Sequence, residues 1–457
     1  MPDRGSLRSA LAALTLLCWT IGAAAADTAR SKNGEPPAFP GAVGWAASTP
    51  GGRGGRVLKV TRLDGSGPGS LRAVLNTPGP RIIVFEVGSV IDLERTTLKL
   101  EEPFVTIAGQ TAPSPGITLI RGGMDIATHD VIIRHIRIRP GGAGAEPPTG
   151  WGEGGWGEDG ISTASARNVI VDHCSLTWAT DENLSASGPR FTGELPEDWR
   201  RGTSHRITFS HNIIAEGLAN STHNKFEHSK GSLIHDNATD ILIYGNLYAN
   251  NFERNPMFKG GAHGVVVNNF IYNPGQRGVH YNLMALEWGD VPFERGRMSV
   301  AGNVLRAGPS TEPPLAFMML GGHGDLEYYG RDNLAVDRIG QPIPQVGRYT
   351  TGPARLIAVD DPPEWWPDLA VRPSAEVERW VLENAGARPW DRDAHDVRVL
   401  ADAAEGRGKI IDNEGEVGGY PDPSPTRRAF DPEQWDLETM MPKTEDALDS
   451  AASNRGT

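Results

Sequence analysis

Short runs of apolar, mostly β-branched residues recur along the chain, and polar turns separate them. Runs of this length and composition predict short strands, each followed by a bend and a further short strand. The clearest runs begin at Val105, Val131, Val169, Ile207, Ile241, Val265 and Met298. The pattern predicts an all-β protein through most of its length.

Asparagine recurs at the bends of these runs. It stands at Asn212, Asn246, Asn269, Asn303 and Asn333, which are 34, 23, 34 and 30 residues apart. Asparagine accepts the left-handed conformation, and its amide can bond the same residue in the coils above and below. The repeat therefore predicts a parallel β-helix with one coil per step. A β-sandwich would show hairpin signals such as Asn-Gly between the runs, and these are nearly absent.

The pattern changes near the C-terminus. The segments "SAEVERWVLENAGARP" and "DAHDVRVLADAAEG" predict two short amphipathic helices, the first of them stopped by Gly386. We expect a β-helix over residues 27–345 and a small, partly helical extension over residues 346–420. Residues 421–457 are polar and contain proline, so we expect a tail that wraps the surface or is disordered.

The N-terminal residues have the order of a secretory signal. Arg4 and Arg8 precede an apolar run that ends in small residues at Ala24–Ala26. We expect a signal peptide over residues 1–26 and a secreted protein, periplasmic or extracellular. The apolar run is shorter than the ~20 residues that span a bilayer, so no membrane anchor is expected. Cleavage leaves Cys174 as the remaining cysteine, which excludes an intramolecular disulfide.

The overall charge narrows the choice of partners. The chain carries a formal charge of −13 at pH 7, and removal of a leader with two arginines and one aspartate makes it −14. Nucleic acid and anionic membrane are poor partners for such a protein, and we expect a monomer. A site for an anionic polymer would have to concentrate cations locally, as the stretch "RNPMFK" does with Arg254 and Lys259.

Several motifs carry a family resemblance. The segments "FPGAVGWAASTPGGRGG", "GSGPGSLRAVL", "VTIAGQTAPSPGI", "DHCSLTWATDENLS" and "RNPMFKGGAHGVVVNNFIYN" occur in this order. Together they resemble bacterial pectate lyases of polysaccharide lyase family 1, over roughly Phe39 to Asn273. The resemblance implies a right-handed parallel β-helix, dependence on Ca²⁺, and β-elimination of polygalacturonate (pectate), the acidic polysaccharide of plant cell walls.

Elimination on a uronate sets two chemical requirements. The proton at C5 becomes acidic only when positive charge neutralises the neighbouring carboxylate, and a base must stand over that proton. The resemblance implies that Arg254 is the base. It also implies a substrate contact for Lys259, where the family more often has arginine. The ammonium group of lysine is a point charge and lacks the paired N–H donors of a guanidinium.

A further lysine is expected to bind substrate. Lys230 in "HSKGSLIHD" matches the family's substrate-binding lysine, and Lys225 is the alternative because the preceding segment blurs the register. His223, His228 and His235 surround it, but no spacing among them matches a zinc-ligand pattern. We expect these histidines to be solvated or to serve packing.

Calcium requires several hard oxygen ligands that converge, usually from two or more carboxylates. Asp159 in "GEDGIS", and Asp181 with Glu182 in "WATDENLS", fall at positions expected to stack on neighbouring coils. These three residues are the metal-site candidates. The family often has a further acid two places before the first, where this chain has Gly157.

Other functions remain open at this stage. A β-helix can be a non-catalytic carbohydrate-binding protein, or a lyase for a different uronan. A hydrolase would use paired carboxylates such as Asp159 and Asp181, but the hydrolase motifs are missing. The sequence does not separate pectate from methylated pectin, or internal from terminal cleavage.

Overall fold

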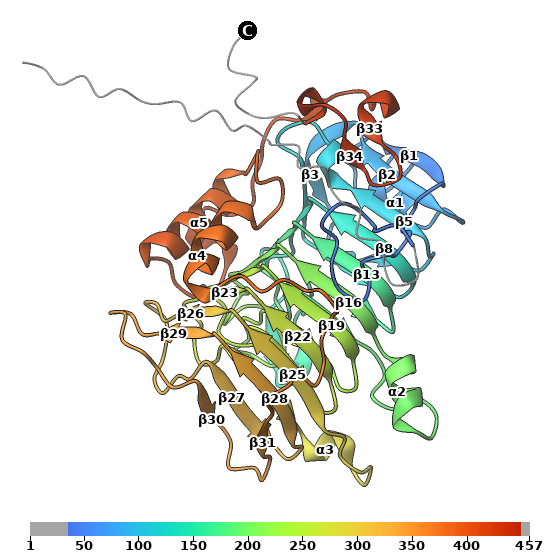
Figure 1. The fold of residues 1–457 in the computed structure, drawn as a ribbon. Coiled ribbons are helices and arrows are strands. Elements are labelled where there is room, and N and C mark those ends of the chain that lie inside the picture. The colour runs from blue at the N-terminus through green and yellow to red at the C-terminus, as the bar shows by residue number, and fades with distance from the viewer. Residues whose placement is uncertain (1–34, 449–457) are drawn as a thin grey trace, which may run out of the picture.

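The computed structural model describes residues 35–448, which wind into a parallel β-helix with short helices along its side (Figure 1). The strands form three long sheets, and strands that neighbour each other in a sheet come from successive coils. The signal peptide expected at residues 1–26 lies outside the described residues. No described helix is long and apolar enough to cross a membrane.

Each full coil contributes one strand to each sheet. The first sheet contains β1 (Arg56–Val60), β2 (Arg81–Phe85), β5 (Val105–Ala108), β8 (His129–Arg134), β13 (Arg167–Asp172), β16 (His205–Ser210), β19 (Thr239–Tyr244), β22 (His263–Val267), β25 (Gly296–Ala301), β28 (Leu326–Arg331) and β31 (Leu356–Ala358). The second contains β3 (Val87–Asp92), β6 (Ile117–Ile120), β9 (Arg137–Arg139), β14 (Ser175–Thr177), β17 (Ile213–Ala215), β20 (Leu247–Ala249), β23 (Phe270–Tyr272), β26 (Val304–Arg306) and β29 (Leu334–Val336). The third contains β4 (Leu98–Leu100), β7 (Met124–Ile126), β12 (Ile161–Ala164), β15 (Leu184–Ser187), β18 (Leu233–Ile234), β21 (Met257–Lys259), β24 (Val279–Leu283), β27 (Met318–Gly322) and β30 (Val346–Arg348).

Short helices and hairpins lie outside these three sheets. The helices are α1 (Leu71–Leu75), α2 (Pro196–Gly202), α3 (Ala285–Trp288), α4 (Ser374–Asn384) and α5 (Ala394–Glu405), with single 3₁₀ turns at Gly109–Thr111, Glu414–Val417, Pro432–Gln434 and Glu445–Ala447. Two small hairpins are β10 (Pro148–Gly150) with β11 (Glu153–Gly154), and β33 (Trp435–Asp436) with β34 (Met441–Pro442). The two predicted helices are thus confirmed as α4 and α5.

The asparagine ladder is present at the turn between the first and second sheets. The Asn246 side chain donates to Asn269 Oδ1 at 2.9 Å, and the Asn269 side chain donates to Asn303 Oδ1 at 3.0 Å. The expectation that the ladder residue itself takes the left-handed conformation is wrong. That conformation belongs to the preceding residue, for example Asn268 with φ +56° and Gly302 with φ +63°. The left-handed residue turns the chain, and the asparagine after it points into the stack.

The interior is filled by lines of apolar side chains that stack from coil to coil. Val171, Phe209, Ile243 and Val266 are register partners on successive strands of the first sheet, and all four are fully buried. Parallel strands lie ~4.8 Å apart, so such lines pack continuously along the axis. Cys174 is free and buried in the same core, so this core supplies the stability that a disulfide cannot.

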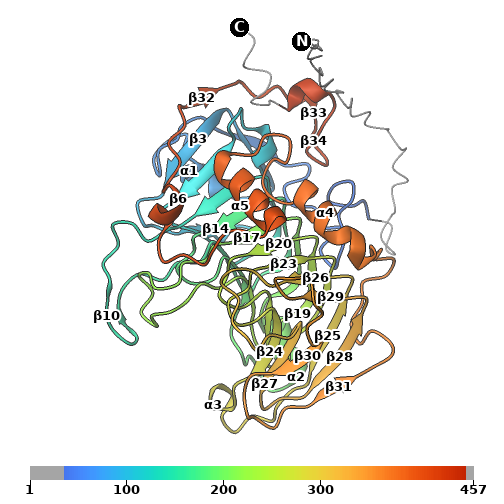
Figure 2. The same cartoon turned by 90° about the vertical axis from the view of Figure 1, so that its left-hand side faces the viewer.

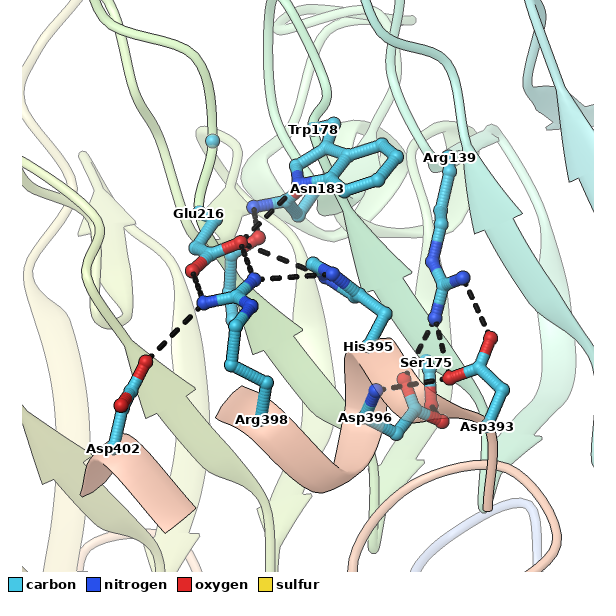
Figure 3. A network of polar contacts seen from close by, with 12 residues as sticks. Arg139, Ser175, Trp178, Asn183, Glu216, Asp393, His395, Asp396, Arg398 and Asp402 are labelled. Carbon is cyan, nitrogen blue, oxygen red and sulfur yellow. Dashed lines mark hydrogen bonds and ion pairs between the residues drawn. The ribbon is translucent and has the colours of Figure 1, made fainter. Parts of the chain in front are cut away.

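The helices α4 and α5 cover the outer face of the second sheet (Figure 2). Val377 and Val381 of α4 and Val399 of α5 pack against buried residues such as Ile213 and Leu247. Beside this apolar contact lies a network of buried charges between the sheet and α5 (Figure 3).

That network ties α5 to two coils. Arg139 of β9 forms ion pairs with Asp393 at 2.7 Å and with Asp396 at 2.9 Å, and Ser175 donates to Asp396 at 2.8 Å. Arg398 forms an ion pair with Glu216 at 2.8 Å. The helix is therefore fixed by charged as well as apolar contacts.

The described part of the polar tail is packed. β32 (Thr426–Arg427) pairs antiparallel with β3 and covers the end of the second sheet. Phe430, Trp435 and Met440 are buried against Ile82 on the outside of the first sheet. The chain thus returns to the N-terminal end of the β-helix, where β33 and β34 lie near β1 and β2 (Figure 1).

Candidate functional site

The candidate residues lie on the loops that connect the second sheet to the third. Glu182, Lys230 and Glu253 are direct register partners on three successive coils. Asp159 falls at the equivalent position one coil earlier, because Ile161 pairs with Leu184. Residues far apart in sequence are thereby stacked at the ~4.8 Å spacing of parallel strands. The result is a row of charged groups along one edge of the third sheet.

The three predicted metal ligands are brought together. One oxygen from each of Asp159, Asp181 and Glu182 lies within 4.8 Å of the others. Asp159 accepts hydrogen bonds from the Glu182 backbone N–H at 2.9 Å and from Ser185 Oγ at 2.8 Å. Burial, and then the charge of Asp181, raise the pKa of Asp159 well above its ordinary value. Crowded carboxylate oxygens of this kind fit a calcium ion, which would relieve their repulsion.

Two histidines hold one of these carboxylates. The expectation that they are solvated is wrong because both are buried, whereas their ring stacking fits the packing role. His228 Nε2 lies 2.7 Å and His223 Nε2 3.3 Å from the oxygens of Asp181, and the two rings stack with centroids 3.8 Å apart. His223 Nδ1 accepts the Lys225 backbone N–H at 3.0 Å, so the proton of this ring is on Nε2 and faces Asp181. Although burial by itself raises it, hydrogen bonds from His223 and His228 lower the pKa of Asp181.

The position of His223 explains the glycine at 157. A Cβ on Gly157 would start 2.6 Å from His223 Cδ2. The imidazole therefore occupies the space that a side chain at position 157 would need, and the acid that the family often has there cannot coexist with it. In this chain, Asp181 is held by the two imidazoles.

The cations gather on the next coils around a buried carboxylate, that of Glu253. Lys230 Nζ lies 2.5 Å from Glu253 Oε1, the Arg277 guanidinium also pairs with Glu253, and Arg254 Nε lies 4.0 Å away. Burial, followed by the charge of Arg277, lowers the pKa of Lys230 to about 7. Lys225, the alternative to Lys230, is exposed outside this group.

Arg254 contacts both the acids and the cation group. Its guanidinium pairs with Glu182, and its side chain keeps 21% of its surface accessible. The residue has a left-handed backbone, with φ +62°. Burial lowers the pKa of Arg254 even though Asp181 and Asp159 act in the opposite direction. The shift favours the neutral guanidine that a base requires.

Lys259 is placed in a different group. It lies on β21, with its Nζ 3.3 Å from Asp236 and in contact with Glu287. Arg190 shares both carboxylates, at 3.1 Å from Asp236 and 2.7 Å from Glu287. The partners of Arg254 in the cation group are thus Lys230 and Arg277, reached through Glu253, and Lys259 has carboxylates of its own.

Sequence reasoning missed Glu253 and Arg277. Met257 pairs with His280, so Arg277 stands in the same register as Arg254, three residues before each partner. Aligning "RNPM" with "RGVH" as equivalent coil positions would have found Arg277. Glu253 carried no such signal, because an acid next to an arginine looks like a surface ion pair.

Comparison with known proteins gives one consistent picture. No family model matches the chain. The chain is similar to "Probable pectate lyase C" of Neosartorya fischeri, with 32% identity over 393 residues, 84% of this chain and 81% of that protein. The protein of the same name from Emericella nidulans is 37% identical over 275 residues, 60% of this chain. That match spans 54% of the Emericella protein, so the chain covers about half the length of this relative.

A solved structure shows the same fold. Jun a 1, the major allergen of cedar pollen, superposes with a TM-score of 0.51 over 76% of this chain and 92% of the allergen, at 18% identity. At that identity the likeness concerns the fold alone. The two sequence relatives are fungal proteins, whereas the motifs resemble bacterial enzymes.

Proposed function

Because the chain belongs to the pectate lyase family, we propose that it cleaves polygalacturonate by β-elimination and leaves an unsaturated uronide at the new chain end. The observation that carries the proposal is the row of charges on successive coils. Three carboxylates, then Lys230, Arg254 and Arg277 on the following coils, match what elimination next to a carboxylate requires. We further propose that the enzyme belongs to polysaccharide lyase family 1, and that it is a secreted monomer.

In this mechanism Arg254 takes the C5 proton in its neutral form. The electron pair of the C5–H bond forms the C4–C5 double bond, the bond from C4 to the bridging oxygen breaks, and that oxygen takes a proton from water to leave as a hydroxyl group. Arg254 then returns its proton to solvent. Glu182 orients the Arg254 side chain by direct contact with it. Lys230 binds and partly neutralises the uronate carboxylate. Lys259 is a second proposed substrate contact, one that would have to exchange Glu287 for the substrate.

Asp159, Asp181 and Glu182 would hold calcium. Calcium supplies positive charge next to the uronate carboxylate when it is bound. The chain's own contribution is to keep the oxygens in place: Ser185 and the Glu182 backbone hold Asp159, while His223 and His228 hold Asp181.

The direct test is ultraviolet absorbance during incubation with polygalacturonate, with and without a calcium chelator. Elimination creates a conjugated product that absorbs, and we expect absorbance that chelator abolishes and added calcium restores. New reducing ends without absorbance would indicate a hydrolase. Binding without either product would indicate a carbohydrate-binding β-helix. Activity only on a different uronan would change the proposed substrate but not the proposed reaction.

A further inference from the structure

The row of charged groups does not end at Arg254. Arg277 occupies the equivalent position on the next coil, and beyond it lies an open cavity of about 500 Å³. Arg277, Arg348, Tyr349 and Met319 contribute to its wall. The cavity therefore continues the candidate site along the axis of the β-helix, over the last strands of the third sheet.

The charge of Arg348 is available to a ligand. Its guanidinium donates to the backbone carbonyls of Gly352, at 2.8 Å, and Ala354, and among residues 35–448 it has no carboxylate partner. These bonds hold the guanidinium in place without neutralising it. The residue is exposed, so the positive charge faces solvent at the cavity.

Tyr349 supplies a ring beside this charge. The Arg277 guanidinium lies over the ring at 4.6 Å from its centre, and the ring of His280 meets it edge to face at 5.7 Å. Thr350 Oγ accepts the Gly322 backbone N–H at 2.8 Å and anchors the loop that follows. The wall of the cavity is thus preorganised, with the Tyr349 ring held by Arg277 and His280.

We propose that this cavity is a substrate subsite for a uronate residue outside the cleaved pair, with Arg348 as the group that binds its carboxylate. The inference rests on the proposed function, since it assigns more of the same polymer to the same face. A linear chain laid across the coils meets a new coil every ~4.8 Å, so a chain held at Arg254 and continued past Arg277 reaches this cavity. A fixed guanidinium suits a carboxylate because it offers paired donors.

Oligogalacturonates of increasing length test the subsite. For the wild-type enzyme, kcat/KM should rise with each added residue until the cavity is filled. Arg348→Gln should remove the last increment, a loss of roughly tenfold on long oligomers, and leave the shortest cleaved oligomer unaffected. Arg348→Lys keeps the positive charge, so it should retain most of the increment, although lysine cannot reproduce both carbonyl contacts. Arg201→Gln, an exposed charge removal on α2, serves as the matched control.

The outcomes separate this inference from the proposed function. Equal losses at all lengths, or equal losses in Arg348→Gln and Arg348→Lys, would show that Arg348 only anchors its loop and would overturn the subsite. If the wild-type enzyme cleaves no oligomer, calorimetry can measure the affinity of the wild-type and Arg348→Gln proteins for the same series of oligomers. An affinity that rises with oligomer length and depends on Arg348 would then support the subsite while the lyase proposal fails. Methyl esters of the long oligomers should lose the increment in the wild-type enzyme, because an ester carries no charge.

Discussion

Two groups of charged residues are both largely buried, one beneath α5 and one in the candidate site, yet the pKa values in them move in opposite directions. Beneath α5, burial by itself would lower the pKa of Arg139, but Asp393 and Asp396 raise it above its ordinary value. In the site, burial lowers the pKa of Lys230 to about 7 and lowers that of Arg254. The first group thus stabilises the charged form of Arg139, whereas the second shifts the two cations Lys230 and Arg254 toward their neutral forms.

The difference comes from how the charges are arranged. Beneath α5, Arg137 and Arg139 face Asp393 and Asp396, so opposite charges alternate at direct contact. Figure 3 shows Arg139 with the two aspartates. In the site, Lys230 and Arg277 share the one carboxylate of Glu253, and the carboxylates of Asp159, Asp181 and Glu182 crowd together. Strained charge clusters that border an accessible cleft are typical of functional sites, whereas matched ones are typical of structural networks. The comparison predicts that substitutions in one region change activity and in the other change stability.

The largest expected effect is on Arg254. Arg254→Lys should lower kcat by about 10²- to 10⁴-fold, because proton abstraction depends on placement to within a fraction of an ångström. The thermal midpoint should stay close to that of the wild-type enzyme. Initial rates from product absorbance and a melting curve provide both numbers. Turnover near the wild-type level would remove Arg254 from the mechanism.

The matched substitution beneath α5 should have the reverse profile. Asp396→Asn leaves Arg137 and Arg139 buried with one fewer carboxylate charge, and should lower the free energy of unfolding by about 3–5 kcal/mol. Asp402→Asn, at the other end of α5, should cost under about 1 kcal/mol because its ion pairs are partly exposed. Denaturant unfolding measures both. A loss of kcat in folded Asp396→Asn protein would contradict the division between the regions.

A smaller effect is expected at the calcium ligands. Asp181→Asn should raise the calcium concentration for half-maximal activity by about tenfold or more, with little change in metal-free stability, because the ligands project from loops. His228→Leu should have a weaker effect in the same direction, and His228→Gln, which keeps an N–H donor, should restore most of the affinity. Full activity in excess chelator would exclude the calcium proposal together with all three ligands.

The smallest expected effect is the uptake of a fraction of a proton when substrate binds. The Lys230 amine is charged below its pKa of about 7 and neutral above it, and a bound uronate carboxylate favours the charged form. Binding should therefore take up a fraction of a proton per site at a pH about one unit above this pKa, and almost none well below it. Calorimetry in buffers of different ionisation enthalpy measures the uptake. Lys230→Met should abolish it, and Lys225→Met, which changes an exposed lysine, should not.

Much of the fold was predictable because its signals are local. The apolar runs and the asparagine repeat predicted the β-helix, and the amphipathic segments predicted α4 and α5. The candidate acids Asp159, Asp181 and Glu182 were found together because each follows a recognisable motif next to a strand. Their stacking could be expected from the sequence because the two segments are only one coil apart, as the pairing of β12 with β15 shows.

The sequence by itself therefore determined the coil architecture, the covering helices and the kinds of charge that gather on one set of loops. The tertiary structure alone decided which charges meet. It joined Arg254 to Lys230 and Arg277 through Glu253, gave Lys259 to Asp236 and Glu287, and turned His223 toward Asp181. The physical reason is that coils differ in length: ladder positions such as Asn246, Asn269 and Asn303 are 23 and then 34 residues apart. Hydrogen bonding between parallel strands, not distance along the chain, sets the register that brings these side chains together.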